Sequence, residues 1–275
     1  MPTPKRAATL ALALLASFSL SAVALADDDA GRGICRDRCG FRVRSGDDSV
    51  VGVRAAVTDV RLTGADDRTW GVMLAGRGES YVSDGFGSGR ATHGFAIGGG
   101  SGGFEGALDL GLAAGFRVPI TADFGPFLRI GGRGWLAGNS TLYTSFLELP
   151  EGQVGLQVAS GRSLLEVAGR GGPVLAGRYD PGDGGYRALG SSFEYGGHLA
   201  IHLAPLRLHG AFRRVDARRT GDGTPVDVWT GDVCLVWGLA LCADVQRWQG
   251  NVALAGAFHG AASTYAGLLI GFSAE

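Results

Sequence analysis

Histidine and carboxylate side chains gather in one stretch of the sequence and are the residues best suited to acid–base chemistry. Glu194, His198 and His202 are each four residues apart, and His209 follows beyond Pro205. Hydrolases and acyltransferases combine histidine with a nucleophile and an acidic partner. On a strand, however, residues four apart are separated by about 13 Å, so Glu194, His198 and His202 cannot bond directly. Only His202 and His209 can approach each other, across the turn at Pro205.

The expected role of His198, His202 and His209 is therefore a polar interior site, hydrogen-bonded to arginine or carboxylate neighbours. We predict no catalytic residue, no metal site and no cofactor. The run from Gly98 to Gly103 fits the G-x-G-x-x-G nucleotide pattern, but 49 glycines make chance matches common. A strand rather than a helix is expected after it, so no nucleotide site is predicted.

Composition places the chain among folded, β-rich proteins. Hydrophobic residues make up 45%, which excludes a disordered chain, and the 49 glycines exclude a helical bundle. The net charge of -1 gives no electrostatic reason to expect a nucleic-acid partner.

The N-terminus has the features of a secretory signal peptide over residues 1–26. Lys5 and Arg6 precede an apolar stretch that ends in Ala24-Leu25-Ala26, directly ahead of three aspartates. An uncleaved anchor helix is the less favoured alternative. Residues 27–48 are polar and charged, and we expect them to form a periplasmic tail.

Four cysteines remain after removal of the signal peptide, and export favours their oxidation. Cys234 and Cys242 are symmetric about Gly238 and would face each other across a tight hairpin. That pairing leaves Cys35 with Cys39. A zinc site is disfavoured because paired Cys-x-x-Cys motifs and a nearby histidine are missing.

From residue 49 onward, apolar and polar residues alternate with the period of a strand. In 104–118, the apolar face includes Phe104, Leu108 and Leu112, whereas the other face is polar or small. The same alternation recurs over 191–203 and 206–213, and short connections alternate with longer polar ones such as 171–189, 217–225 and 249–262. We predict about twelve strands, with ten as the lower bound, near 50–62, 69–77, 90–98, 104–118, 126–137, 141–158, 163–170, 190–203, 206–216, 226–237, 239–248 and 263–273.

Strand length and charge distribution favour a membrane barrel. Twelve residues tilted by about 40° span roughly 30 Å, close to the apolar thickness of a bilayer with its aromatic rims. The polar faces would then line the lumen with charges of both signs: Glu105, Asp109, Arg117, Arg129, Arg133, Glu166, Arg170, Glu194, Arg207, Arg213, Asp232 and Asp244.

Over residues 50–275 the chain resembles bacterial outer-membrane β-barrel proteins, through these amphipathic strands and a final strand from Thr264 to Phe272. The resemblance is architectural, so no family's functional residues can be carried over. It implies an all-β, up-and-down antiparallel transmembrane barrel over 49–275, in the outer membrane of a Gram-negative bacterium. The expected partners are outer-membrane lipids and, during biogenesis, the barrel-assembly machinery; the oligomeric state is left open.

The expected function is structural or pore-type, without catalysis. A narrow lumen would hold its charges as a packed polar core, and a wide one would hold a weakly selective channel. One alternative is a lipid- or peptide-modifying enzyme that uses the lumen histidines. Another is a soluble periplasmic barrel with Phe104, Leu108 and Leu112 around an apolar ligand. A spanning helix over residues 249–274 is the weakest membrane interpretation, because glycines and polar residues interrupt it.

Overall fold

The computed structural model describes residues 44–62, 65–83, 86–101, 103–121, 123–139, 143–160, 163–180, 185–216, 225–249 and 262–274. The predicted signal peptide over 1–26 and the proposed Cys35–Cys39 pair lie outside these residues. Most of the predicted tail over 27–48 also lies outside them, but its last residues do not: the first strand begins at Arg44.

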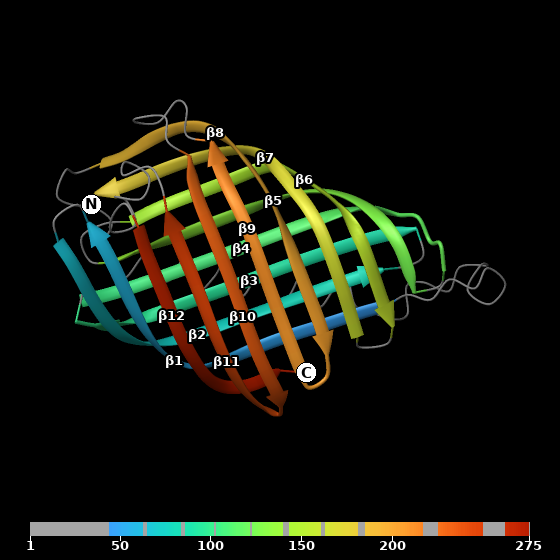
Figure 1. The fold of residues 1–275 in the computed structure, drawn as a ribbon, viewed down its shortest axis with the longest axis horizontal. Helices are drawn as coiled ribbons and strands as arrows, with labels where there is room; N and C mark the ends of the chain where they lie inside the picture. The colour runs from blue at the N-terminus through green and yellow to red at the C-terminus, as the bar shows by residue number, and fades with distance from the viewer. Residues whose placement is uncertain are drawn as a thin grey trace. The chain divides into compact units, whose positions relative to one another are not determined.

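Twelve antiparallel strands form a closed barrel in which each strand pairs with the next and the first pairs with the last (Figure 1). This confirms the predicted fold class and strand number. The strands are β1 (Arg44–Leu62), β2 (Ala65–Ser83), β3 (Gly87–Gly100), β4 (Gly103–Arg117), β5 (Phe124–Asn139), β6 (Tyr143–Ser160), β7 (Ser163–Asp180), β8 (Gly185–Leu203), β9 (Leu206–Asp216), β10 (Val226–Trp237), β11 (Leu239–Gln249) and β12 (Ala262–Ala274).

An even number of strands places the start of β1 and the end of β12 at one end of the barrel, which we call the terminal end. The connections at this end are short, and include the two-residue turn between β8 and β9 and the single Gly238 between β10 and β11. Gly238 has a φ of +83°, a backbone conformation that side chains other than glycine rarely adopt. A one-residue turn at this position therefore depends on glycine.

The prediction of a long polar connection over 171–189 is wrong. β7 continues to Asp180 and β8 starts at Gly185, and the two strands pair along almost their whole length. Glycine and aspartate in this segment suggested a loop on propensity alone. Pairing with neighbouring strands on both sides outweighs the weak intrinsic preference of these residues.

Apolar side chains point away from the barrel axis, as β8 shows most clearly. Phe193, Tyr195 and Leu203 are exposed, whereas Glu194 and His202 between them are buried. Exposed large hydrophobic residues occur on every strand except β9, within the side chains that the structure describes. On β8 this band runs from Phe193 to Leu203 and covers about 25 Å along the barrel axis, at roughly 3.3 Å per residue and a tilt near 40°.

Aromatic residues flank the apolar band at both ends. Phe116, Trp237 and Phe272 are exposed near the terminal end of β4, β10 and β12. Trp70 and Trp229 are exposed toward the opposite end of β2 and β10. Two aromatic rims with an apolar band between them are typical of barrels in bilayers.

No helix in the described part of the chain is long and apolar enough to cross a membrane.

The C-terminal segment, which a spanning-helix interpretation placed in one helix over 249–274, contains strand β12 over Ala262–Ala274. β12 pairs with β11 on one side and with β1 on the other. It is therefore the strand that closes the barrel.

Candidate functional site

Charged side chains fill the barrel interior and pair with one another across it. Nine of the predicted lumen charges are held in ion pairs that the structure describes. These pairs are Asp109–Arg133, Arg129–Glu166, Arg170–Glu194, Arg213–Glu194, Asp232–Arg77 and Asp244–Arg54. Arg117 is buried against the hydroxyl of Ser83, and Arg207 borders a cavity inside the barrel. Glu105 lies on β4, but its side chain is outside the described part.

The most deeply buried ion pair joins Arg129 on β5 to Glu166 on β7. Two hydrogen bonds connect them: Nη1 to Oε1 at 3.0 Å and Nη2 to Oε2 at 2.9 Å. Their side chains are 0% and 1% exposed. Arg129 Nε donates to Ser88 Oγ at 2.8 Å, and His198 Nε2 lies 2.9 Å from Glu166 Oε1. We call Ser88, Arg129, Glu166 and His198 the arginine cluster.

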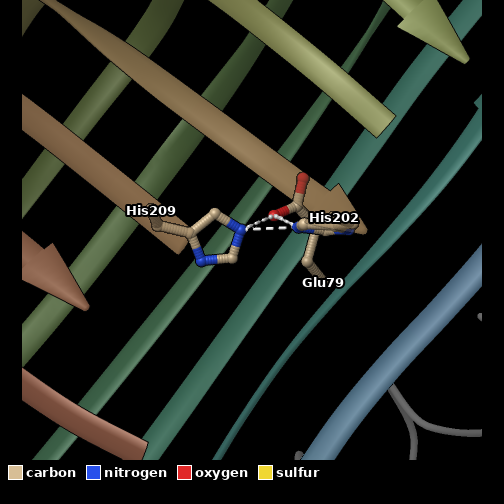
Figure 2. A group of neighbouring side chains, drawn as sticks. All are labelled: Glu79, His202 and His209. Atoms are coloured by element: carbon tan, nitrogen blue, oxygen red, sulfur yellow. Dashed lines mark hydrogen bonds and ion pairs between the residues drawn. The ribbon is translucent and has the colours of Figure 1, made fainter. Parts of the chain in front are cut away.

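A second polar group forms near the terminal end, where side chains of β8 and β9 meet a side chain of β2 across the lumen. Figure 2 shows Glu79, His202 and His209 pointing toward one another. His202 Nε2 lies 2.7 Å from His209 Nε2, and His209 Nε2 lies 3.0 Å from Glu79 Oε2. The third separation, from His202 Nε2 to Glu79 Oε2, is 3.8 Å. We call these three residues the histidine cluster, and they confirm the predicted approach across the Pro205 turn.

Residues around the histidine cluster hold its members in place. Asp232 Oδ1 lies 3.0 Å from His209 Nδ1, and Arg77 Nη1 lies 2.9 Å from Asp232 Oδ2. Arg90 binds Glu79, with Nε 2.5 Å from Oε1 and Nη2 3.1 Å from Oε2. Arg90 also reaches Glu166 and His198, so it connects the two clusters.

Strand β6 places two glutamates inside although they are three residues apart. Strict alternation would send Glu148 and Glu151 to opposite faces. The register with β7 shifts between Glu148 and Gly152, and both carboxylates face Arg170 as a result. Sequence reasoning missed both residues, although Pro150 between them is a signal, because proline cannot donate to the strand ladder and is typical of bulges.

Glu79 and Arg90 were also missed, although a signal for Glu79 exists. Trp70, Val72 and Val82 on β2 are outward and exposed, so the period of two assigns Glu79 to the opposite, inward face. Met73 and Ala75 share that inward face and reduce the contrast between the two sides. Because the two faces of β2 differ little in polarity, the alternation did not single out Glu79.

A cavity of about 330 Å³ lies inside the barrel, bordered by both clusters. Its lining includes Arg77, Glu79, His198, His209 and Asp232. Below it, toward the terminal end, side chains with almost no exposure fill the interior. We call this group the terminal plug: Tyr81, Ser83, Arg117, Phe127, Arg129, Gln157, Leu164, Glu166 and His202.

The disulfide Cys234–Cys242 joins β10 to β11 and confirms the predicted pairing. Both cysteines are buried, together with Val50, Met73 and Leu269, in an apolar cluster within the barrel. Cys234 Sγ also accepts a hydrogen bond from Arg77 Nη2. The disulfide is therefore on the inward face of the barrel wall.

One further histidine, His93 on β3, faces outward. Its Nε2 lies 3.5 Å from Ser49 Oγ on β1, across Gly78. A side chain on Gly78 would overlap both partners. His93 was not among the predicted site residues, because no local pattern links it to Ser49, which is 44 residues away in the chain.

A closed antiparallel barrel with apolar residues outside and paired charges inside has the architecture of bacterial outer-membrane β-barrel proteins. The resemblance predicted from the sequence is confirmed at this level. The interior histidines are hydrogen-bonded to carboxylates, as expected: His198 to Glu166, and His209 to Glu79 and Asp232.

Comparison with known proteins gives similarity of fold alone. No protein-family model and no curated protein matches the chain. Solved structures similar to it include the outer membrane phospholipase A from Escherichia coli, with 13% identity, 81% of this chain and 92% of that chain covered, and a TM-score of 0.42. The anion-selective porin from Comamonas acidovorans has 10% identity, coverage of 85% and 100%, and a TM-score of 0.39. The deltaS2 mutant of the monoaromatic hydrocarbon channel TodX has 9% identity, coverage of 83% and 90%, and a TM-score of 0.37.

Proposed function

We propose that the protein is an integral outer-membrane barrel of the structural type, whose lumen is closed at rest by its own charged side chains and which performs no catalysis. One observation carries this proposal: exposed apolar side chains form an outward band on every strand except β9, among the described side chains, while the arginines and carboxylates are buried and paired inside.

The outward band supports a bilayer location. Its height of about 25 Å on β8 matches the apolar band of outer-membrane barrels, and aromatic rims flank it. A soluble barrel would need the reverse arrangement, with its apolar residues enclosed. Leu112 is 61% exposed and Arg129 is 0% exposed, which argues against the soluble barrel that binds an apolar ligand.

The terminal plug supports a closed lumen. In an open channel, charges on the inner wall are solvated by water in the pore. Here Arg129, Gln157 and Glu166 are at most 1% exposed, and the arginine is neutralised by two hydrogen bonds to its carboxylate. The mixed-charge interior thus corresponds to the packed polar core of a narrow barrel rather than to a wide pore.

The burial of the lumen histidines supports a role without catalysis. His198 and His202 are 8% and 2% exposed and lie behind the barrel wall, where acyl chains of the surrounding lipid do not reach. If these residues modified lipid or peptide, replacing each with alanine would change lipid A or the envelope peptides of the host. We expect both to remain unchanged.

Conductance measurements test the closed lumen. We expect the refolded protein in planar bilayers to show no steady conductance steps. The double variant R129A/E166A, which removes the buried ion pair of the terminal plug, should show them because water then fills the space. Correct folding of both proteins is checked by heat-dependent gel mobility. Steady steps in the unmodified barrel would contradict the proposal, as would release of the protein from membranes without detergent.

A further inference from the structure

The histidine cluster places three metal-binding atoms from three strands within reach of one ion. One ligand atom from each of Glu79, His202 and His209 lies within 4.8 Å of the other two (Figure 2). Each residue comes from a paired strand rather than a loop: β2, the end of β8 and the start of β9. The positions of the three side chains are therefore fixed by the barrel itself.

The hydrogen-bond pattern around His209 calls for a positive centre between the three side chains. Asp232 accepts a hydrogen bond from Nδ1 of His209, which assigns the proton of the neutral ring to that nitrogen. The lone pair on Nε2 then points at the carboxylate of Glu79, 3.0 Å away, and at His202. Two lone pairs at that distance repel unless a proton or a metal ion lies between them.

A metal ion bonds to all three atoms at once, whereas a proton on Nε2 of His209 stays bound to that nitrogen and is only shared with the other two atoms. We propose that Glu79, His202 and His209 bind a divalent transition-metal ion, with zinc as the representative. Two imidazole nitrogens and one carboxylate oxygen are a donor set that zinc and its neighbours prefer. At metal–ligand distances near 2.1 Å, a tetrahedral site separates its ligand atoms by about 3.4 Å. Both histidine nitrogens and the glutamate oxygen reach that separation with shifts of a few tenths of an ångström.

Neighbouring residues supply the support that metal ligands require. Asp232 holds the ring of His209 in the carboxylate–histidine arrangement that orients metal-bound imidazoles. Arg90 holds both carboxylate oxygens of Glu79, with Nε at Oε1 and Nη2 at Oε2, and Oε2 also lies 3.0 Å from His209 Nε2. Glu79 and Asp232 supply two negative charges beside the ion, and Arg90 and Arg77 pair with these carboxylates.

The site is accessible from inside the barrel. Glu79 and His209 border the central cavity, and the side chain of His209 is 32% exposed. Three protein ligands leave at least one coordination position for water or a small anion, on the cavity side. This inference does not depend on the closed lumen, because an open barrel would hold the same three ligands.

Zinc binding by the refolded, untagged full chain tests the proposal. The protein is first treated with a chelator, and zinc bound per barrel is then measured by equilibrium dialysis with metal analysis. The background chain is C35S/C39S/H259A, since Cys35, Cys39 and His259 lie outside the described residues and are metal-binding types. We expect one zinc ion per barrel in this background.

Matched variants locate the ion. His202→Ala and His209→Ala should each abolish binding, and Asp232→Asn should weaken it by about 10- to 100-fold. The control His93→Ala removes an outward histidine and should bind zinc like the background. Equal binding by folded H202A, H209A and H93A barrels would refute the proposal, and so would the absence of zinc from the background.

X-ray absorption of zinc bound to the background chain gives a readout that does not require folded variants. We expect scattering from two imidazole rings and from light oxygen or nitrogen ligands. A spectrum without imidazole scattering would overturn the assignment. Cobalt in place of zinc should give the visible absorption bands of a four- or five-coordinate site.

Discussion

The two polar clusters of the barrel interior are each built around a buried glutamate, but they differ in the side chains that contact it. The arginine cluster joins a permanent cation to a carboxylate through two hydrogen bonds, and both side chains are almost fully buried. The histidine cluster brings two imidazoles to a carboxylate beside the cavity, with the side chain of His209 still 32% exposed.

The difference follows from which atoms keep a lone pair. The guanidinium of Arg129 has five N–H donors and no acceptor, so its contact with Glu166 leaves no free electron pair for an ion. An imidazole whose other nitrogen is held by Asp232 keeps a lone pair on Nε2. One cluster can therefore only close the lumen, whereas the other can also take up a cation. Residue type, not position in the barrel, separates closure from binding.

Breaking the arginine cluster should have the largest effect. Glu166→Ala leaves Arg129 buried without its carboxylate, and such a loss costs about 3–5 kcal/mol of the free energy of unfolding. Urea unfolding followed by gel mobility in lipid vesicles measures the change. The double variant R129M/E166M, which removes both charges and fills the space, should lose less than the single variant. A double variant that is less stable than E166A would contradict this account.

Zinc should stabilise the barrel through the histidine cluster by a smaller amount. At a free zinc concentration 100-fold above the dissociation constant, the gain in the free energy of unfolding is about 2.7 kcal/mol. The same unfolding assay, run with zinc and with chelator, measures it. The gain should vanish in H209A and persist in H93A. A gain of equal size in H209A would show that zinc acts elsewhere.

The smallest effect is expected outside both clusters. Arg214 and Asp227 form two hydrogen bonds of 2.7 and 2.6 Å between β9 and β10, with side chains 39% and 25% exposed. Arg214→Ala should change stability less than either preceding perturbation, because solvent screens an exposed pair. The difference should shrink further as salt is added. A loss comparable with that of E166A would remove the distinction between buried and exposed pairs.

Much of this fold could be predicted from the sequence, because alternation has a direct spatial meaning in a strand. The faces of 106–118 and 192–203 follow from the period of two, and the pairing of Cys234 with Cys242 follows from symmetry about Gly238. His202 and His209 met for a similar reason: a two-residue turn leaves little choice of register. Local rules suffice where partners are close in sequence.

Partners that are distant in sequence could not be predicted in this way. Glu79 meets His209 only because the barrel closes and brings β2 opposite β9, which no local pattern encodes. Glu148 and Glu151 share a face because of a bulge, and a single shifted residue reverses every later assignment on a strand. Prediction of the candidate site therefore requires the strand register in three dimensions, whereas prediction of the fold largely does not.

The buried disulfide between β10 and β11 has a consequence for the order of assembly. Cys242 is fully buried and Cys234 nearly so, on the inner surface of a wall that is continuous all the way round. An oxidising enzyme needs direct access to both sulfur atoms, and the closed barrel wall blocks that access. The disulfide is therefore expected to form before the barrel closes. The chain would then reach the membrane with the β10–β11 hairpin already crosslinked.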